Sequence, residues 1–154
     1  MNALIQSAGI LVYRRNGDFV NVLLCKSGGP YYVNAPRGWG IPKGILEKNE
    51  DSLIAAQREF KEETNLRIDA PLEYLGKFRT TKEKEVSIFI CEEDLSLADF
   101  KSNFFEMEYP KGSGEIHSYP ENDGIGWFEL QEAKEKIFVG QIQILEALER
   151  YLKG

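Results

Sequence analysis

The sequence predicts an α/β domain with a mixed β-sheet, because segments with strand character lie on both sides of a central helical segment and further helical segments follow. Ser7 to Arg14 and Val20 to Cys25 are rich in Val, Ile, Leu and Tyr. The Asn16-Gly17 turn between them is a hairpin signal. Residues 95–109 fit neither pattern. The other predicted strands are 72–79, 85–91 and 125–130, and the predicted C-terminal helices are 130–137 and 141–152, the second with an apolar stripe of Ile142, Leu145, Leu148 and Leu152.

Residues 51–64 form the strongest predicted helix. Asn49 or Asp51 can cap its N-terminus, and Asn65 can end it in the left-handed conformation that Gly adopts most often and Asn sometimes. An apolar spacing of i, i+3 and i+7 predicts the face that packs on the sheet. The residues of that face are Leu53, Ala56 and Phe60.

Composition limits the function classes. The 154 residues suffice for one domain, 1–154, with a sizeable core, and the net charge of −6 argues against a general nucleic-acid binder. No apolar run reaches the length of a membrane span, and Met1 to Gly9 lacks the pattern of a signal peptide. Cys25 and Cys91 lie inside apolar runs and are expected to be reduced core thiols, so we expect a cytoplasmic protein without a membrane partner.

Three carboxylates are concentrated on one arc of the predicted helix. Glu59, Glu62 and Glu63 are related by i, i+3 and i+4, so they share an arc of roughly 100°. Like charges this close repel one another, and hard divalent cations that prefer oxygen ligands would relieve the repulsion. A solvated acidic surface is the alternative explanation, and the register of the surrounding residues is what disfavours it.

The segment from Gly44 to Leu66 resembles the Nudix box, G-x5-E-x7-R-E-U-x-E-E-x-G-U, in which U is apolar. It departs from the pattern only at Asn65, where the family has Gly, and Asn tolerates the same positive φ. The resemblance covers nearly the whole chain, which is similar to a bacterial group of predicted Nudix nucleoside triphosphate pyrophosphohydrolases. The matching residues are Gly44, Glu50, Arg58, Glu59, Phe60, Glu62, Glu63 and Leu66.

The resemblance implies an α/β/α sandwich and a hydrolase that uses Mg²⁺ or Mn²⁺ to cleave phosphoanhydrides. It implies that Glu59 and Glu63 bind the metal, with Glu62 in support and a loop carbonyl near Lys43 or Gly44 as a further ligand. Arg58 would orient a carboxylate in the catalytic site, and Glu50 would tie the loop to the helix.

The general base is left open by the sequence. Glu121 is one candidate because it lies just before the Trp127-Phe128 strand, and Glu115 is another. His117 is the only histidine, but metal-assisted hydrolysis does not require it.

The residues before the box carry the signals for substrate. Arg37 and Lys43 could contact phosphates, and Tyr32 or Trp39, like Tyr31, could stack on a base. The run from Gly38 to Gly44 (GWGIPKG) resembles the corresponding segment of Nudix enzymes that cleave dinucleoside polyphosphates.

We therefore expect a nucleoside diphosphate-X substrate, with a dinucleoside polyphosphate foremost. The alternatives are a sanitising triphosphate pyrophosphohydrolase and a Nudix-fold nucleotide-binding module without catalysis. The expected partner is a nucleotide or another small phosphoanhydride, and the expected state is a monomer or homodimer.

Overall fold

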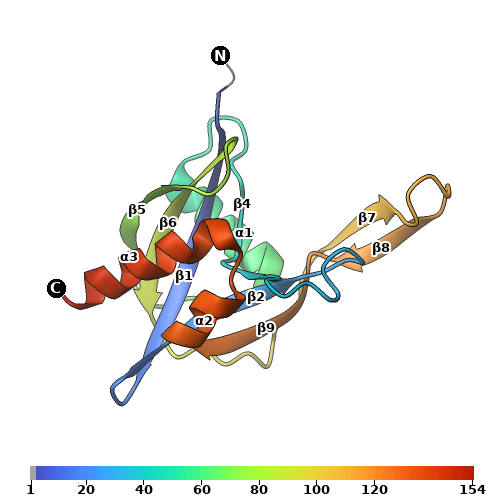
Figure 1. The fold of residues 1–154 in the computed structure, drawn as a ribbon. Coiled ribbons are helices and arrows are strands. Elements are labelled where there is room, and N and C mark those ends of the chain that lie inside the picture. The colour runs from blue at the N-terminus through green and yellow to red at the C-terminus, as the bar shows by residue number, and fades with distance from the viewer. Residues whose placement is uncertain (1–2) are drawn as a thin grey trace.

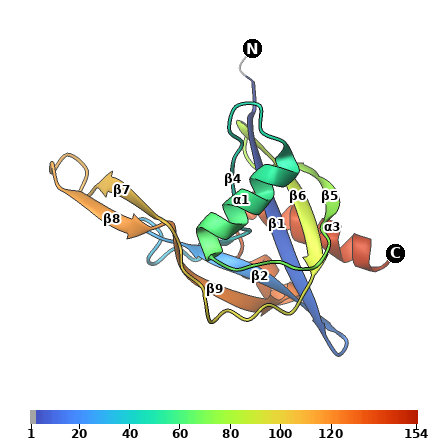
Figure 2. The ribbon, with the colours of Figure 1, turned by 180° about the vertical axis from the view of Figure 1, so that it is seen from behind.

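Three layers make up the protein in the computed structural model, which describes residues 3–154 (Figure 1). A seven-stranded mixed sheet lies between α1 on one face and the C-terminal helices on the other, as expected for an α/β/α sandwich (Figures 1 and 2). The strands are β1 (Ile5–Asn16), β2 (Phe19–Ser27), β3 (Trp39–Gly40), β4 (Lys43–Ile45), β5 (Glu73–Arg79), β6 (Lys84–Glu92), β7 (Phe104–Glu108), β8 (Ile116–Pro120) and β9 (Asn122–Glu129). The helices are α1 (Ser52–Thr64), α2 (Leu130–Lys136), the short 3-10 helix η1 (Val139–Gln141) and α3 (Ile142–Leu152).

The sheet is mixed because β1 pairs in parallel with β6 and antiparallel with β2. The order is β3-β2-β1-β6-β5, with β4 added to β1 and β9 added to β2. The predicted β1–β2 hairpin is confirmed: Asn16 pairs with Phe19, and Gly17 has the positive φ of 64° that the turn requires. Along one edge of β1, β4 pairs with residues 7–9 and β2 with residues 13–16, whereas β6 pairs along the other edge over residues 5–13.

Helix α1 begins and ends where its capping residues predict. Asp51 accepts hydrogen bonds from the N–H groups of Leu53 and Ile54, and Asn65 ends the helix with a φ of 62°. Ala56 and Phe60 are buried as expected. The prediction was wrong for Leu53, which is 37% exposed, because its turn of the helix borders an open groove formed with Leu66 and Leu72 instead of the core.

Two apolar clusters hold the layers together, one on each face of the sheet. Under α1 the cluster includes Ile10, Leu23 and Phe60, and under α2 and α3 it includes Leu11, Leu24 and Leu145. This alternation of neighbouring residues between the two clusters is the period-two pattern of a strand buried on both faces. The predicted α3 stripe is confirmed, and both cysteines are buried and free.

A separate two-stranded sheet, β7–β8, projects from the body and is called the arm here (Figures 1 and 2). The sequence did not predict it: residues 95–109 were unassigned, and β8 is a short Ile-His-Ser-Tyr-Pro run without alternating hydrophobicity. Two-stranded ribbons carry weak sequence signals because they bury little apolar surface of their own. Among residues 3–154, none of the helices is long and apolar enough to span a membrane.

Candidate active site

Arg58 is the centre of the hydrogen-bond network on the acidic face of α1. Its Nε and Nη2 donate to the two carboxylate oxygens of Glu50 at 2.9 and 2.8 Å. Its Nη1 donates to Glu59 at 2.7 Å and to Glu62 at 3.3 Å, and its Nη2 also reaches the Ile45 carbonyl at 3.3 Å. One guanidinium thus joins the loop before α1 to two of the three carboxylates that the sequence placed on one arc.

The charges within this network stabilise one another. The hydrogen bonds from Arg58, followed by that from the Glu47 backbone, lower the pKa of Glu50 to about 2. The pKa of Arg58 is raised in turn, chiefly by Glu50. Both groups therefore stay ionised at neutral pH, and the position expected for Glu50 between loop and helix agrees with the contacts in the structure.

Glu59 lies directly against Gly44 of β4. A Cβ atom at position 44 would come within 1.9 Å of the Glu59 Cδ atom, so only glycine leaves room for this carboxylate. Strand β4 is held there by its pairing with β1, in which Gly44 lies opposite Ala8. Burial raises the pKa of Glu59, although the bond from Arg58 opposes the shift.

Glu63 lies one turn further along α1 and contacts the residue before Gly44. Its Oε2 accepts a hydrogen bond from the backbone N–H of Lys43 at 3.0 Å. Burial, and then the charge of Glu59, raise the pKa of Glu63 to about 8. Burial and the nearby charge of Lys84 lower the pKa of Lys43, whereas the charges of Glu63 and Glu59 oppose this shift. Lys43 therefore lies close to both carboxylates.

These residues supply suitable donors for a divalent cation. Carboxylates whose pKa is raised by burial and by one another are sites where a bound cation is electrostatically favourable. Within residues 3–154, however, no three acidic, histidine or cysteine side chains are already gathered into a ligand shell. Arg58 donates to Glu59 Oε1 and the Lys43 N–H donates to Glu63 Oε2, so the second oxygen of each carboxylate accepts no hydrogen bond from the residues that the structure describes and could face a cation. The donor chemistry fits the expected Mg²⁺ or Mn²⁺, with Glu59 and Glu63 as the residues that would hold it.

Of the candidate bases, the structure brings Glu121 toward α1. Its backbone N–H donates to the Asn103 carbonyl at 2.8 Å and its carbonyl accepts from Gly28 at 2.9 Å. Its charge contributes to the raised pKa values of Glu59 and Glu63, and burial raises its own pKa. Glu121 is thus anchored at the base of the arm, near the carboxylates of α1.

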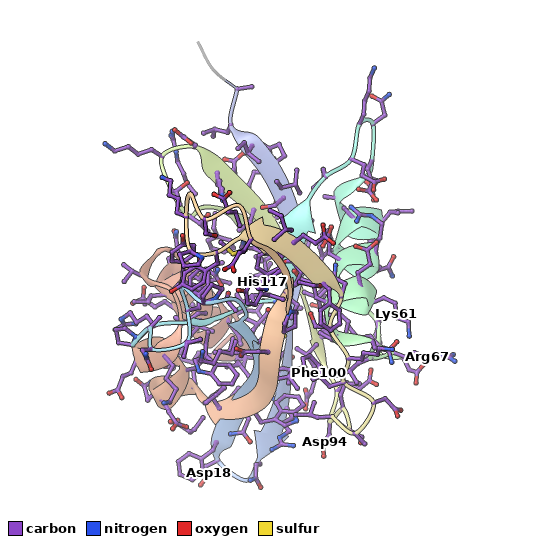
Figure 3. All side chains as sticks on the ribbon, turned by 90° about the vertical axis from the view of Figure 1, so that its right-hand side faces the viewer. Asp18, Lys61, Arg67, Asp94, Phe100 and His117 are labelled. Atoms are coloured by element: carbon purple, nitrogen blue, oxygen red, sulfur yellow. The ribbon has the colours of Figure 1, made fainter. Side chains whose placement is uncertain are left out.

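The other two candidates lie farther out on the arm. Glu115 and His117 are both exposed, with 3.9 Å between the His117 Nε2 and a Glu115 carboxylate oxygen. Figure 3 shows His117 on the arm, which there points toward the viewer. The structure does not bring either residue to the acidic face of α1.

The predicted substrate-binding residues divide into two groups. Lys43 lies beside the carboxylates, whereas Arg37 donates to the carbonyls of Lys134 and Ile137 at 2.8 and 3.0 Å, at the C-terminal end of α2. Two aromatic contacts lie on the same side of the sheet as Arg37. They are Trp39 on Phe128 at 4.6 Å between ring centroids and Tyr32 on Phe138 at 5.8 Å.

Sequence reasoning missed Asn122. Its side chain is buried, and its Nδ2 has no hydrogen-bond partner among the residues that the structure describes. It directly follows Glu121, and its own N–H donates to the Ser102 hydroxyl at 2.9 Å. Nothing in the sequence could have found it, because the Glu-Asn-Asp-Gly run has the composition of an exposed turn.

An Arg-bridged acidic helix against a glycine-bearing strand, held in an α/β/α sandwich, is the combination expected from the Nudix box. The sequence model of the NUDIX domain matches residues 3–148, and the chain therefore belongs to the NUDIX domain family.

Individual relatives differ in the substrate that their names give. Over 103 residues the chain is 34% identical to the Bacillus subtilis (strain 168) protein named "Putative 8-oxo-dGTP diphosphatase YtkD". This match covers 65% of this chain and 63% of that protein. Over 63 residues it is 35% identical to the asymmetrical bis(5'-nucleosyl)-tetraphosphatase of Caenorhabditis elegans, covering 41% of this chain and 42% of that protein. The matched segments thus span less than two thirds of the length of these curated relatives.

A solved structure shows the same fold over almost the full length. The binary complex of a C. elegans Ap4A hydrolase matches with a TM-score of 0.66 at 22% identity, over 96% of this chain and 98% of that chain. At this identity the likeness concerns the fold alone.

Proposed function

We propose that this protein is a metal-dependent Nudix hydrolase that cleaves a phosphoanhydride bond of a nucleoside diphosphate-X compound. The observation that carries the proposal is the Glu59 carboxylate, which lies in the space left by Gly44 and is held by Arg58. Such a bridge orients a carboxylate whose pKa is raised, beside a second one on Glu63. A protein that only needed a solvated acidic surface would have no use for the glycine.

The residues have separate tasks in the proposed reaction. Glu59 and Glu63, with Glu62 and the Gly44 carbonyl in support, would hold the cation, and Arg58 keeps Glu59 aligned. A bound divalent cation neutralises charge on the phosphoryl oxygens and lowers the pKa of a bound water. Lys43 offers a positive charge to a phosphate oxygen.

The proposed bond change is a hydrolysis. The oxygen of a water molecule bonds to phosphorus while the bond from that phosphorus to the bridging oxygen breaks, and the leaving phosphate takes the electron pair. The carboxylate of Glu121 accepts the proton of the attacking water, because it is the candidate base that the structure anchors near α1.

A dinucleoside polyphosphate is the substrate that we propose first. The GWGIPKG segment before the box supports this, as does the likeness to the tetraphosphatase of C. elegans. The second candidate is a nucleoside triphosphate, which the likeness to the B. subtilis protein favours. A binding module without catalysis is disfavoured because the acidic residues are intact. The cytoplasmic location and the monomeric or homodimeric state stay predictions.

Turnover of a nucleotide panel with Mg²⁺ tests this proposal. The panel contains dinucleoside polyphosphates and nucleoside triphosphates, and product identification shows which bond breaks. We expect Glu59→Gln to lower kcat about a thousandfold, since the loss of a charged ligand removes stabilisation that acts in the transition state. The proposal would be rejected if wild type and Glu59→Gln formed equal amounts of product, or if wild type formed no product from any substrate in the panel.

The same assay separates the candidate bases. Glu121→Gln should lower kcat about a hundredfold, within the usual range for general-base catalysis. Glu115→Gln removes the same charge from the exposed part of the arm and should leave kcat unchanged. A larger loss of kcat in Glu115→Gln than in Glu121→Gln would identify Glu115 as the general base instead.

A further inference from the structure

The two faces of the arm differ in what covers them. One face is covered by the loop of residues 28–37: a Cβ atom on Gly29 would lie 3.0 Å from the ring of Phe105, and Tyr31 packs edge-on against Tyr109 at 5.7 Å. On the other face Phe104 is 61% exposed and Ile116 is 59% exposed. The loop therefore contacts one face of the arm, and the other face, called the bare face here, exposes Phe104 and Ile116.

The pairing of β7 with β8 defines which residues share the bare face. Phe104 lies opposite Pro120, and Glu108 lies opposite Ile116. Side chains alternate between the faces of a strand pair, so the pair two positions from each of these, Glu106 with Ser118, lies on the same face. Its six residues are Phe104, Glu106, Glu108, Ile116, Ser118 and Pro120.

The bare face is on the α1 side of the molecule. The 28–37 loop contacts the opposite side, through Tyr32 on Phe138 and Arg37 at the end of α2. Figure 2 shows α1 on the near face of the main sheet, and Figure 3 shows α1 and the C-terminal helices on opposite sides of the molecule. The N–H of Asn103 donates to the Glu62 carbonyl at 3.2 Å, so the base of the arm is joined directly to α1.

Phe104 is therefore an exposed aromatic residue at the point where the arm joins α1. It follows Asn103, which contacts the backbone of Glu62, and it pairs with Pro120, which precedes Glu121. The ring thus lies within one residue of the backbone contact with α1 and of the position that pairs next to Glu121, and its π-face is available for stacking.

The charge of the bare face limits what can lie on it. Within β7 and β8, which the structure describes completely, the bare face has two carboxylates and no lysine or arginine. The Glu108 carboxylate accepts from the N–H groups of Gly112 and Gly114, whereas Glu106 is exposed and is free to repel an anion. A phosphate chain would be repelled here, but an uncharged aromatic group with hydrogen-bond donors would be accommodated.

We propose that Phe104 is the stacking platform for the base of a nucleotide substrate whose phosphates lie against α1. The proposal rests on the proposed function, because it takes the acidic face as the phosphate end of the substrate. It assigns the arm, which lies outside the Nudix box, to recognition of the base. Stacking is tolerant of base identity, so Phe104 would provide affinity for a nucleotide irrespective of its base.

Steady-state kinetics of Phe104→Ala tests the proposal. We expect KM for a nucleotide substrate to rise about tenfold while kcat stays within about twofold, because a stacking contact that is unchanged in the transition state affects binding alone. Phe104→Trp should restore KM. Phe19→Ala is the matched control, since Phe19 is 62% exposed on the far β1–β2 hairpin and should leave KM unchanged. A KM within twofold of wild type for Phe104→Ala overturns the proposal.

A binding measurement separates failure of this proposal from failure of the proposed function. In F104W the added indole fluorescence should be quenched by a saturating nucleotide and not by inorganic pyrophosphate, whereas F19W should respond to neither. Absence of turnover with quenching in F104W would reject the hydrolase and retain the platform. Turnover without this quenching would reject the platform and retain the hydrolase.

Discussion

The acidic face of α1 and the arm differ in how tightly their side chains are held. Arg58 alone donates five hydrogen bonds, to three carboxylates and one carbonyl, and Glu59 fits a space that only glycine leaves. On the arm, Phe104 and Ile116 are mostly exposed, and none of the elements within residues 3–154 covers them. Groups that must meet a reacting phosphorus need fixed positions, whereas a surface that stacks on a base needs only an accessible ring.

The strongest test of the acidic face of α1, called the tight region here, is Gly44→Ala. The added Cβ atom would displace the Glu59 carboxylate, so we expect kcat/KM with Mg²⁺ to fall at least about a hundredfold. The fold should survive, because the atoms in the way are the end of a side chain. Gly124→Ala is the control, since its nearest neighbour, the Lys26 Cβ, would be 3.6 Å away. Wild-type activity in Gly44→Ala would show that Glu59 does not act from the position described.

Proton release on metal binding tests the electrostatics of the same region. Burial and Glu59 raise the pKa of Glu63 from an ordinary 4.5 to about 8, so below pH 8 the metal-free protein holds a proton that a cation must displace. Apparent Mg²⁺ affinity should weaken about tenfold per pH unit below 8. Calorimetry in buffers of different ionisation enthalpy measures the release, which Glu63→Gln should abolish.

The same pKa shift predicts how stability depends on pH without metal. The folded protein holds more protons than the unfolded chain between pH 4.5 and 8, so this carboxyl's contribution to stability is complete below that window and is lost as pH rises through it. Denaturation with and without Mg²⁺ should show that the metal restores stability toward pH 8. A metal affinity that does not change between pH 6 and 8 would contradict both expectations.

The smallest expected effect concerns the loop that supports the arm. Arg37 donates to two carbonyls at the end of α2, and the loss of these bonds in Arg37→Ala should cost about 1–2 kcal/mol of stability. The melting temperature should fall by several degrees while KM stays unchanged. Lys26→Ala, which removes one exposed bond to the Tyr32 carbonyl, is the milder control. A large rise in KM in Arg37→Ala would instead indicate that Arg37 binds the substrate, as the sequence predicted.

Much of the tight region could be predicted from the sequence because its signals are local. The register of Glu59, Glu62 and Glu63, the cap at Asp51 and the left-handed Asn65 all depend on spacings within one helix. The substrate side could not be predicted in the same way. Arg37 lies about 100 positions from the carbonyls it contacts, and the sequence offers no rule for such distant pairs.

The sequence by itself determined the acidic arc, because helix periodicity and capping depend on short stretches of chain, and its resemblance to the Nudix box implied the family and the sandwich. Only the tertiary structure decided which distant groups meet. It placed Gly44 against Glu59, brought Glu121 rather than Glu115 toward α1, and left Phe104 bare on the side of the carboxylates. The physical reason is that strand pairing and loop packing join residues far apart in the chain, and such contacts leave no local periodicity from which they can be predicted.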